Sequence, residues 1–221
     1  MIICGIDQSI TSPAIVKYHL DDNYGISEIE YLGFSDTISL QKLHPNHLIL
    51  SRRKDYKHDL DRFDVMIDSI RDFCKGAEYI AIEGYALNAK GKVFNLAEFC
   101  GLMKWKLVKQ NGNKLRVYPP TVVKKYAGKG NYNKGEMYRA YLESFNKIDL
   151  SVFPQITDDK KGSSPLSDIV DAVFIIECLL TEIKLRRGLL ELKDLKENER
   201  SIFLMVSKSM PINILSQDFI E

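Results

Sequence analysis

Four acidic side chains in this 221-residue sequence stand where an apolar segment begins or ends. Asp7 follows the run IICGI and Glu83 follows the run YIAI, while Asp168 and Asp171 open the apolar segment SDIVDAVFII. Acids are seldom buried without a partner, so their repeated placement beside apolar sequence is informative. Aspartates three residues apart share one face of a helix, so the last two would point in the same direction.

Carboxylates gathered at one place favour the binding of a hard divalent cation. Like charges at close range raise one another's pKa, and a bound cation removes that cost. Mg²⁺ prefers a few carboxylate oxygens and completes its shell with water and phosphate oxygens. Two such ions ~3.5–4 Å apart can hold the attacking and the leaving oxygen of a phosphodiester displacement. The acids therefore predict metal-dependent phosphodiester chemistry.

Three of the four acids also have an ordinary structural explanation, whereas Glu83, at the end of an apolar strand, is harder to explain in this way. An Asx turn would account for Asp7 at the end of a strand. Asp168 could be a helix N-cap and Asp171 the acid at N3, and both positions are favourable near the positive end of a helix dipole. For the aspartate pair alone, capping is the simpler interpretation. Together the four acids favour a metal site, in which Asp171, one turn inside the helix, is the stronger ligand candidate.

The elements that must position these acids follow from hydrophobic periodicity. Strands are predicted at 2–6, 13–20, 26–34, 78–84 and 114–119. Helices are predicted at 60–73, 94–110, from Thr121, at 136–145 and from Asp168 onward. Three strands joined by turns, followed by strand–helix–strand units, predict an α/β fold with a mixed sheet, first an antiparallel meander and then parallel strands, flanked by helices. Both acidic strand ends would then lie at one edge of the sheet, where open α/β sheets bind ligands.

The predicted domain spans residues 1–187, and two stretches depart from its regular pattern. Residues 35–58 are polar and lack a period, which predicts an irregular insertion. The histidines of this stretch, His44, His47 and His58, are expected at the surface rather than at a metal. Residues 188–221 form a C-terminal extension that the sequence does not place.

The composition narrows the class of protein. Hydrophobic residues make up 45% and charged residues 28%, as in an ordinary globular domain, and the net charge is +1. The scattered cysteines fit neither a zinc motif nor a disulfide framework, so we expect them to be reduced and buried. No run approaches ~18 apolar residues and no signal peptide is present, which predicts a cytoplasmic protein without a membrane segment.

Positive charge is concentrated in one part of this nearly neutral chain. Residues 104–139 contain ten lysines and arginines against the single acid Glu136. The block predicts a phosphate-contacting surface whose binding weakens with salt. For Lys104, Lys106 and Lys109 a solvated helix face is the simpler explanation. The residues predicted to contact DNA are Lys124, Lys125, Lys129, Lys134, Tyr85 and Tyr132, and Tyr126 could also stack on a base.

Four segments, in their order and approximate spacing, resemble the RuvC family of Holliday junction resolvases. They are GIDQSITSPAIV, YIAIEGYA, VYPPTVVKKYAGKGNYNKGEM and SDIVDAVFII, and the resemblance covers about residues 1–20 and 78–185. The third segment is the most specific, because a Pro and a Thr lead into Val-Lys-Lys and a Gly-rich turn precedes the lysine that opens a helix. Gln8 departs from the small residue usual in the family, and Tyr85 lies near the aromatic that wedges into the junction.

The resemblance implies a ribonuclease H-like fold in which Asp7, Glu83, Asp168 and Asp171 are the catalytic and metal-binding carboxylates. It implies two Mg²⁺ ions per active site, with Mn²⁺ as a substitute, and Lys134 stabilising charge on the phosphate. It also implies a homodimer that cuts branched DNA, either four-way junctions or forks and flaps, by paired nicks during recombination and repair. A nucleoid-associated protein, or a divergent phage protein in the host cytoplasm, would suit that role.

Two other classes of function remain open from the sequence. GIDQS also resembles the first phosphate loop of sugar kinases and actin-like ATPases. Neither a second Asp-Gly-Gly-type loop nor a Gly-Gly adenosine motif accompanies it, and 221 residues are few for two lobes. A non-catalytic nucleic-acid-binding module on the same fold would be expected to lack one of the acids, and all four are present.

Overall fold

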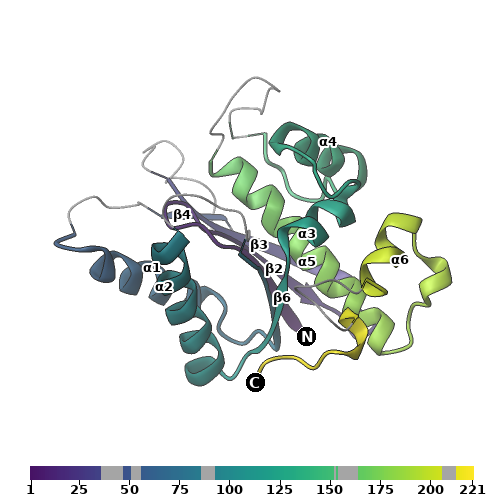
Figure 1. Ribbon diagram of the computed structural model, residues 1–221, viewed down its shortest axis with the longest axis horizontal. Helices are drawn as coiled ribbons and strands as arrows, with labels where there is room; N and C mark the ends of the chain where they lie inside the picture. The colour runs from purple at the N-terminus through teal and green to yellow at the C-terminus, as the bar shows by residue number, and fades with distance from the viewer. Residues whose placement is uncertain (36–46, 51–55, 86–92, 152, 154–163, 206–212) are drawn as a thin grey trace.

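In the described part of the chain, six strands form one mixed sheet at the centre of the molecule. The computed structural model describes residues 1–35, 47–50, 56–85, 93–151, 153, 164–205 and 213–221 (Figure 1). The strands are β1 (Ile2–Asp7), β2 (Ala14–Leu20), β3 (Ile26–Phe34), β4 (His47–Leu50), β5 (Tyr79–Glu83) and β6 (Lys114–Tyr118). Their order across the sheet is β4-β3-β2-β1-β5-β6. The pairs β1–β2 and β2–β3 are antiparallel, and β1–β5, β5–β6 and β3–β4 are parallel, which confirms the predicted meander followed by parallel strands.

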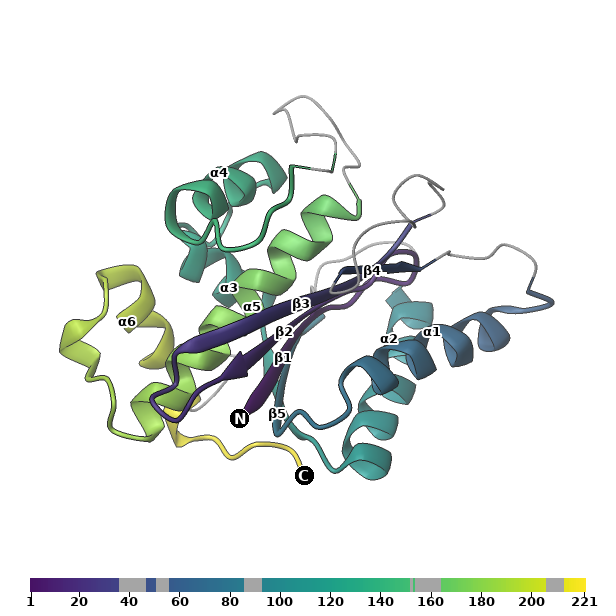
Figure 2. The same cartoon turned by 180° about the vertical axis from the view of Figure 1, so that it is seen from behind.

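Helices cover both faces of this sheet. They are α1 (Asp59–Phe73), α2 (Val93–Trp105), α3 (Pro120–Ala127), α4 (Lys134–Ser144), α5 (Leu166–Arg186) and α6 (Glu197–Phe203). The helices α1 and α2 lie on one side, whereas α3 to α6 lie on the other, as the front and back views both show (Figure 1 and Figure 2). Side chains alternate between the two faces of a strand, so each face has its own apolar core. The result is a three-layer α/β arrangement.

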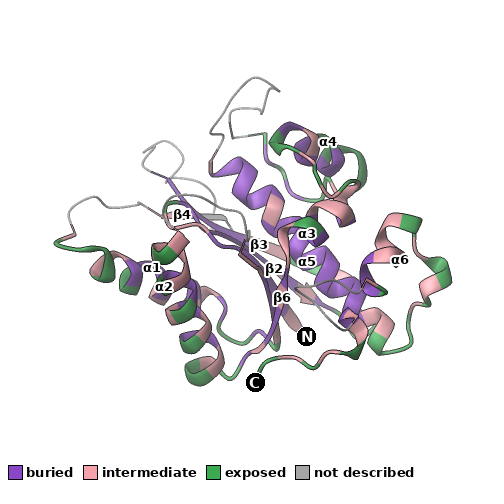
Figure 3. Cartoon of the chain, viewed as in Figure 1, coloured by how far each residue is buried: buried purple, intermediate pink, exposed green. Residues whose placement is uncertain are grey.

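The long helix α5 lies directly on β1 because Gly5 has no side chain. A Cβ atom at this position would come within 2.6 Å of the Ile176 backbone nitrogen and 2.7 Å of the Ala172 carbonyl oxygen. Only glycine therefore allows the helix to approach so closely. Almost every residue of α5 is buried, in contrast to the mixed surfaces of α1 and α2 (Figure 3). This packing fixes the direction in which the acids of α5 point.

The structure corrects the expected course of the chain at three places. The stretch 35–58, predicted to be irregular, contributes β4, which extends the sheet beside β3. The helix with the two aspartates begins at Leu166 after Pro165, so Asp168 lies in its first turn and is not its N-cap. The helix predicted at 94–110 leaves α-helical geometry after Trp105 and continues as a π-helix over Lys106–Gln110. The predictions for His44, and for the side chain of His47, fall outside the described residues.

The C-terminal extension packs against the sheet. Ile220 forms an antiparallel bridge with Leu115 of β6, so it covers part of the edge strand. The Arg116 guanidinium donates hydrogen bonds to the carbonyl oxygens of Gln217 and Asp218, and α6 packs on α3. A charged side chain of the predicted basic stretch thus anchors the tail.

Two expectations from composition can be compared with the structure. All four cysteines, Cys4, Cys74, Cys100 and Cys178, are free and buried, as predicted. Among the described residues, no helix has both the length and the apolar character that a membrane crossing requires.

Candidate active site

The two strand-end acids lie side by side on the face of the sheet that α5 covers. In the parallel pair of β1 and β5, Ile6 is opposite Ile82, so Asp7 and Glu83 follow at matching positions. Since side chains alternate, Asp7 shares its face with Gly5, on which α5 packs. Asp7 is buried, and its carboxyl group interacts electrostatically with that of Glu83. The predicted meeting of these two acids is confirmed.

Burial and mutual repulsion make these carboxyl groups hard to ionise. Burial is the largest cause of the raised pKa of Asp7, and the charges of Glu83, Asp168 and Asp171 raise it further. Burial also raises the pKa of Glu83 to about 7, against the opposing effect of Lys124. The pKa of Asp171 rises to about 8 through burial and the nearby acids. The four predicted acids therefore form one electrostatic cluster.

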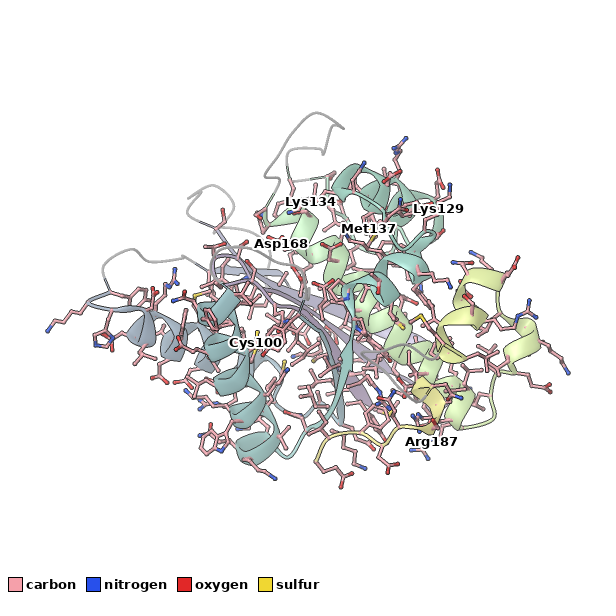
Figure 4. The ribbon with its side chains drawn as sticks, viewed as in Figure 1. Cys100, Lys129, Lys134, Met137, Asp168 and Arg187 are labelled. Carbon is pink, nitrogen blue, oxygen red and sulfur yellow. The ribbon has the colours of Figure 1, made fainter. Side chains whose placement is uncertain are left out.

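Asp168 is held differently from the other three acids. The Ser12 hydroxyl donates to its Oδ2 atom at 2.7 Å, and the Ser167 hydroxyl lies 3.3 Å from its Oδ1 atom. The ammonium of Lys134 lies 3.6 Å from Oδ1 and donates to the Ser167 hydroxyl at 2.9 Å. Figure 4 shows Lys134 beside Asp168 at the N-terminal end of α5. Asp168 therefore positions Lys134 next to the other carboxylates.

The local sequence explains why Lys134 reaches this place. The side chain of Asn133 caps α4 by accepting from the Glu136 backbone N–H, and the Glu136 carboxylate accepts in return from the backbone N–H of Asn133. This capping box fixes the first turn of the helix, which carries Lys134. The Lys134 side chain is half exposed, so it can contact both Asp168 and a bound anion.

The donor set fits a hard divalent cation. In the described part of the chain, no three acidic, histidine or cysteine side chains stand close enough to enclose an ion as they are now arranged. The site nevertheless concentrates four carboxylates, and the cations that offset their charge are Lys134 and Lys124. Oxygen ligands with an excess of negative charge are what Mg²⁺ or Mn²⁺ requires.

Four of the six side chains predicted to bind DNA surround one hollow beside these acids. The hollow has a volume of about 290 Å³, and its lining includes Tyr85, Lys124, Tyr132 and Lys134 together with Glu83 and Asp171. The Tyr132 ring packs directly on Gly128, where a Cβ atom would overlap the ring. Lys125 and Lys129 lie instead around a neighbouring hollow with Lys196 of the C-terminal extension.

The structure divides the basic stretch that the sequence presents as one block. Arg116 is buried and paired with Glu182 at 2.6 Å. The ammonium of Lys106 lies 2.6 Å from Asp64 and 2.8 Å from Asp68, so it belongs to the packing of α1. Tyr126, a candidate for stacking on a base, is buried with its hydroxyl 2.8 Å from that of Thr181. These residues are structural, which corrects the reading of the whole block as a DNA surface.

Two polar residues of the site were not among the predicted functional residues. Ser12 holds Asp168, and Gln8 is buried in the lining of the hollow. The sequence did contain a signal for Gln8, because it is a large polar residue directly after an acid that ends a strand. Ser12 gave no such signal, since its partner is 156 residues away.

The strand order and the position of α5 across the central strands define a ribonuclease H-like fold. The solved structure of RuvC from Thermus thermophilus has this fold, and it aligns with 85% of this chain and 96% of its own at 16% sequence identity and a TM-score of 0.51. T. thermophilus RuvC in complex with Holliday junction substrate aligns over the same shares at 14% identity and a TM-score of 0.49. Fowlpox virus resolvase with its substrate Holliday junction DNA aligns with 83% of this chain and 99% of its own, at 16% identity and a TM-score of 0.45.

Sequence comparison adds no closer relative. No protein-family model matches the chain, and no curated protein matches it. At 16% identity the shared structure establishes the fold, so the function has to be argued from the site.

Proposed function

We propose that this chain is a divalent-cation-dependent endonuclease that cuts branched DNA, with four-way junctions as its substrate. The observation that carries the proposal is the cluster of Asp7, Glu83, Asp168 and Asp171, whose charge is only partly offset by nearby lysines. A site with this excess of negative charge attracts cations, and a phosphodiester can approach it only when they are bound. The motif resemblance to the RuvC family and the shared ribonuclease H-like fold favour DNA junctions as the substrate.

The residues present would divide the work as follows. Asp7, Glu83 and Asp171 would hold two Mg²⁺ ions, with Asp168 assisting. Bound there, the ions would activate water and stabilise the charge that develops on the phosphate. Lys134, fixed by Ser167 and Asp168, would place a further positive charge beside a non-bridging phosphate oxygen. The water oxygen bonds to phosphorus, the bond from phosphorus to the 3′ oxygen breaks, and that oxygen takes a proton. The products are 5′-phosphate and 3′-hydroxyl ends.

The decisive experiment is cleavage of a labelled four-way junction with Mg²⁺ by the wild type and by Asp7→Asn. We expect the variant to lose at least about 10²–10³-fold in rate, because it loses the carboxylate that interacts with all three other acids. Asp22→Asn, in the exposed turn between β2 and β3, is the matched control and should cut like the wild type. Equal cutting by Asp7→Asn would exclude this site.

The same assay tests the homodimer that symmetric cutting requires. We expect nicks at matching positions in opposite arms of the junction, because two identical active sites would face them. Sedimentation of the protein with an uncleaved junction in Ca²⁺ should then give two chains per junction. A single chain per junction would contradict the dimer and leave the endonuclease proposal intact.

A further inference from the structure

Gln8 presents an unused hydrogen-bond donor beside the carboxylates. Its side chain is 7% exposed, and its Nε2 atom has no hydrogen-bond partner among the described residues. Its Oε1 atom accepts a hydrogen bond from the Cys100 thiol. Burial raises the pKa of this thiol to about 12, so the thiol keeps its proton and can donate it to the carbonyl end of the amide. The NH₂ end is then directed away from Cys100.

A buried polar group without a partner is costly, and such groups in native proteins call for an explanation. Glu83, Tyr85, Lys124 and Asp171 line the same hollow as Gln8. A ligand that offers an acceptor to the amide would remove the cost.

The lining of the hollow indicates the chemical class of that ligand. One part of it is charged and contains the acids and lysines of the candidate active site. Most of the remainder is apolar or aromatic, contributed by Tyr85, Val93, Leu96, Pro120, Tyr132 and Met137. A phosphate gains nothing from the apolar side chains and the tyrosine ring faces, whereas the flat faces of a nucleobase can pack on them, and the edge of a base carries acceptors for an amide.

The aromatic walls are held in place before any ligand binds. Tyr85 packs against the apolar core of the α1 and α2 side, and the ammonium of Lys104 lies 4.9 Å from the centre of its ring. Tyr132 packs against Gly128. Lys134 and Met137 extend from α4 on one side of the site, and Cys100 belongs to α2 on the other (Figure 4). The hollow is therefore a preformed space between two helical layers, next to the carboxylates.

We propose that this hollow binds the base of a nucleotide next to the phosphate that is cut, and that Gln8 donates from Nε2 to an acceptor on that base. This rests on the proposed endonuclease function and adds a specificity-determining residue to it. The base must leave its stack to enter, which is easiest where DNA is branched and its pairing is already weakened. The rate of cutting should then depend on the identity of that base.

The test is a set of four-way junctions that carry each of the four bases at the positions flanking the nick. We expect the wild type to cut the best sequence at least ~10-fold faster than the worst. Gln8→Leu keeps the size of the side chain without the donor and should reduce this ratio to below ~3-fold, by slowing only the best sequence. Gln110→Leu, at an exposed position outside the site, should keep the wild-type ratio.

A change in the DNA gives the same information without changing the protein. An apolar isostere of the preferred base, which has its shape but no acceptor, should be cut by the wild type as slowly as the worst base. Equal cutting of all sequences by the wild type would overturn the inference and leave the endonuclease function standing. So would rapid cutting of the isostere, or a wild-type ratio in Gln8→Leu. Failure of the wild type to nick any branched DNA would overturn both.

Discussion

Helix α5 carries acids in both its N-terminal and its C-terminal half, and the two halves differ in whether nearby cations neutralise these acids. Glu182, in its C-terminal half, is fully buried and accepts hydrogen bonds from Arg116 at 2.6 and 3.1 Å, from Arg186 at 2.8 Å and from the Tyr118 hydroxyl. Asp171, in its N-terminal half, lies among other acids that raise its pKa. The same helix thus holds one acid neutralised by protein cations and another that is not.

The comparison shows that burial alone does not identify a functional acid. Glu177, between the two ends, is also buried, and it accepts from the Tyr18 hydroxyl at 2.8 Å and from Lys147 at 3.3 Å. Each of these two glutamates has a fixed donor for its charge, as buried ions in proteins require. A carboxylate cluster without matching cations has to obtain its positive charge from elsewhere. That deficit, rather than burial, indicates a metal site.

At the C-terminal end of α5, removing the charge of Glu182 should destabilise the fold. We expect Glu182→Gln to lower the free energy of unfolding by about 3–5 kcal/mol, because it leaves the buried Arg116 guanidinium beside a neutral amide. Urea denaturation measures the change. Glu143→Gln, at an exposed position on α4, is the control and should change the free energy by less than about 0.5 kcal/mol.

A small effect of Glu182→Gln on stability would contradict the proposed difference between the two ends of α5. The same arginines also hold the C-terminal extension. Arg186 donates to the carbonyl oxygens of Ile214 and Gln217. The Phe219 ring lies 4.4 Å from the Arg116 guanidinium and 5.2 Å from that of Arg186. A loss below about 1 kcal/mol would mean that these contacts do not depend on the glutamate charge.

At the N-terminal end of α5, removing the charge of an acid should instead stabilise the fold. The native pKa of Asp171 is about 8 and that of Glu83 about 7, above the values of about 4 expected in the unfolded chain. The native state therefore binds more protons than the unfolded state between these values, and stability must fall as pH rises from about 4 to about 8. We expect Asp171→Asn to raise the melting temperature at pH 8 in a chelator, by about 2–4 °C for each kcal/mol of repulsion removed.

Thermal unfolding at pH 5 to 9, with a chelator and with Mg²⁺, measures this effect. Mg²⁺ should stabilise the wild type more at pH 8 than at pH 5, because its ligands must lose their protons before they bind it. Asp171→Asn should reduce that gain, and Asp22→Asn should not. A melting temperature of the wild type that is independent of pH in the chelator would contradict the proposed charge deficit.

The strand-end acids and the spacing of Asp168 and Asp171 could be predicted because they depend on local pattern. A strand alternates with a period of two and a helix with a period near 3.6, so each acid could be assigned to an element and a face from its neighbours in sequence. The partner of a charged residue is not a local property. Arg116 lies in a basic stretch, but its acid is 66 residues away on α5, and nothing around it in the sequence distinguishes it from a DNA-contacting residue.

The same limit applies to elements stabilised only by tertiary contacts. The strand β4 is four residues long and depends on pairing with β3, so its sequence lacks an alternation long enough to reveal it. The C-terminal extension is placed by Leu115, which exchanges backbone hydrogen bonds with Ile220, and by the Arg116 guanidinium, which donates to the Asp218 carbonyl oxygen. In both places the position of the segment is determined by the strand that it packs against, and its own sequence does not reveal it.

The lysines extend the comparison of matched and unmatched charge to the surface. Lys106 is matched by Asp64 and Asp68, whereas within the described ranges Lys125 and Lys129 have no ion pair and line one hollow with Lys196. If these lysines contact phosphates, Lys125→Ala and Lys129→Ala should each reduce the slope of log Kd against log salt by about 1 and weaken binding of all junctions alike. Fluorescence anisotropy with a labelled junction in Ca²⁺ at several salt concentrations measures the slope. Lys193→Ala removes an exposed charge that is paired with Glu191 and should leave the slope unchanged. An equal change in all three variants would assign the effect to net charge instead of to this surface.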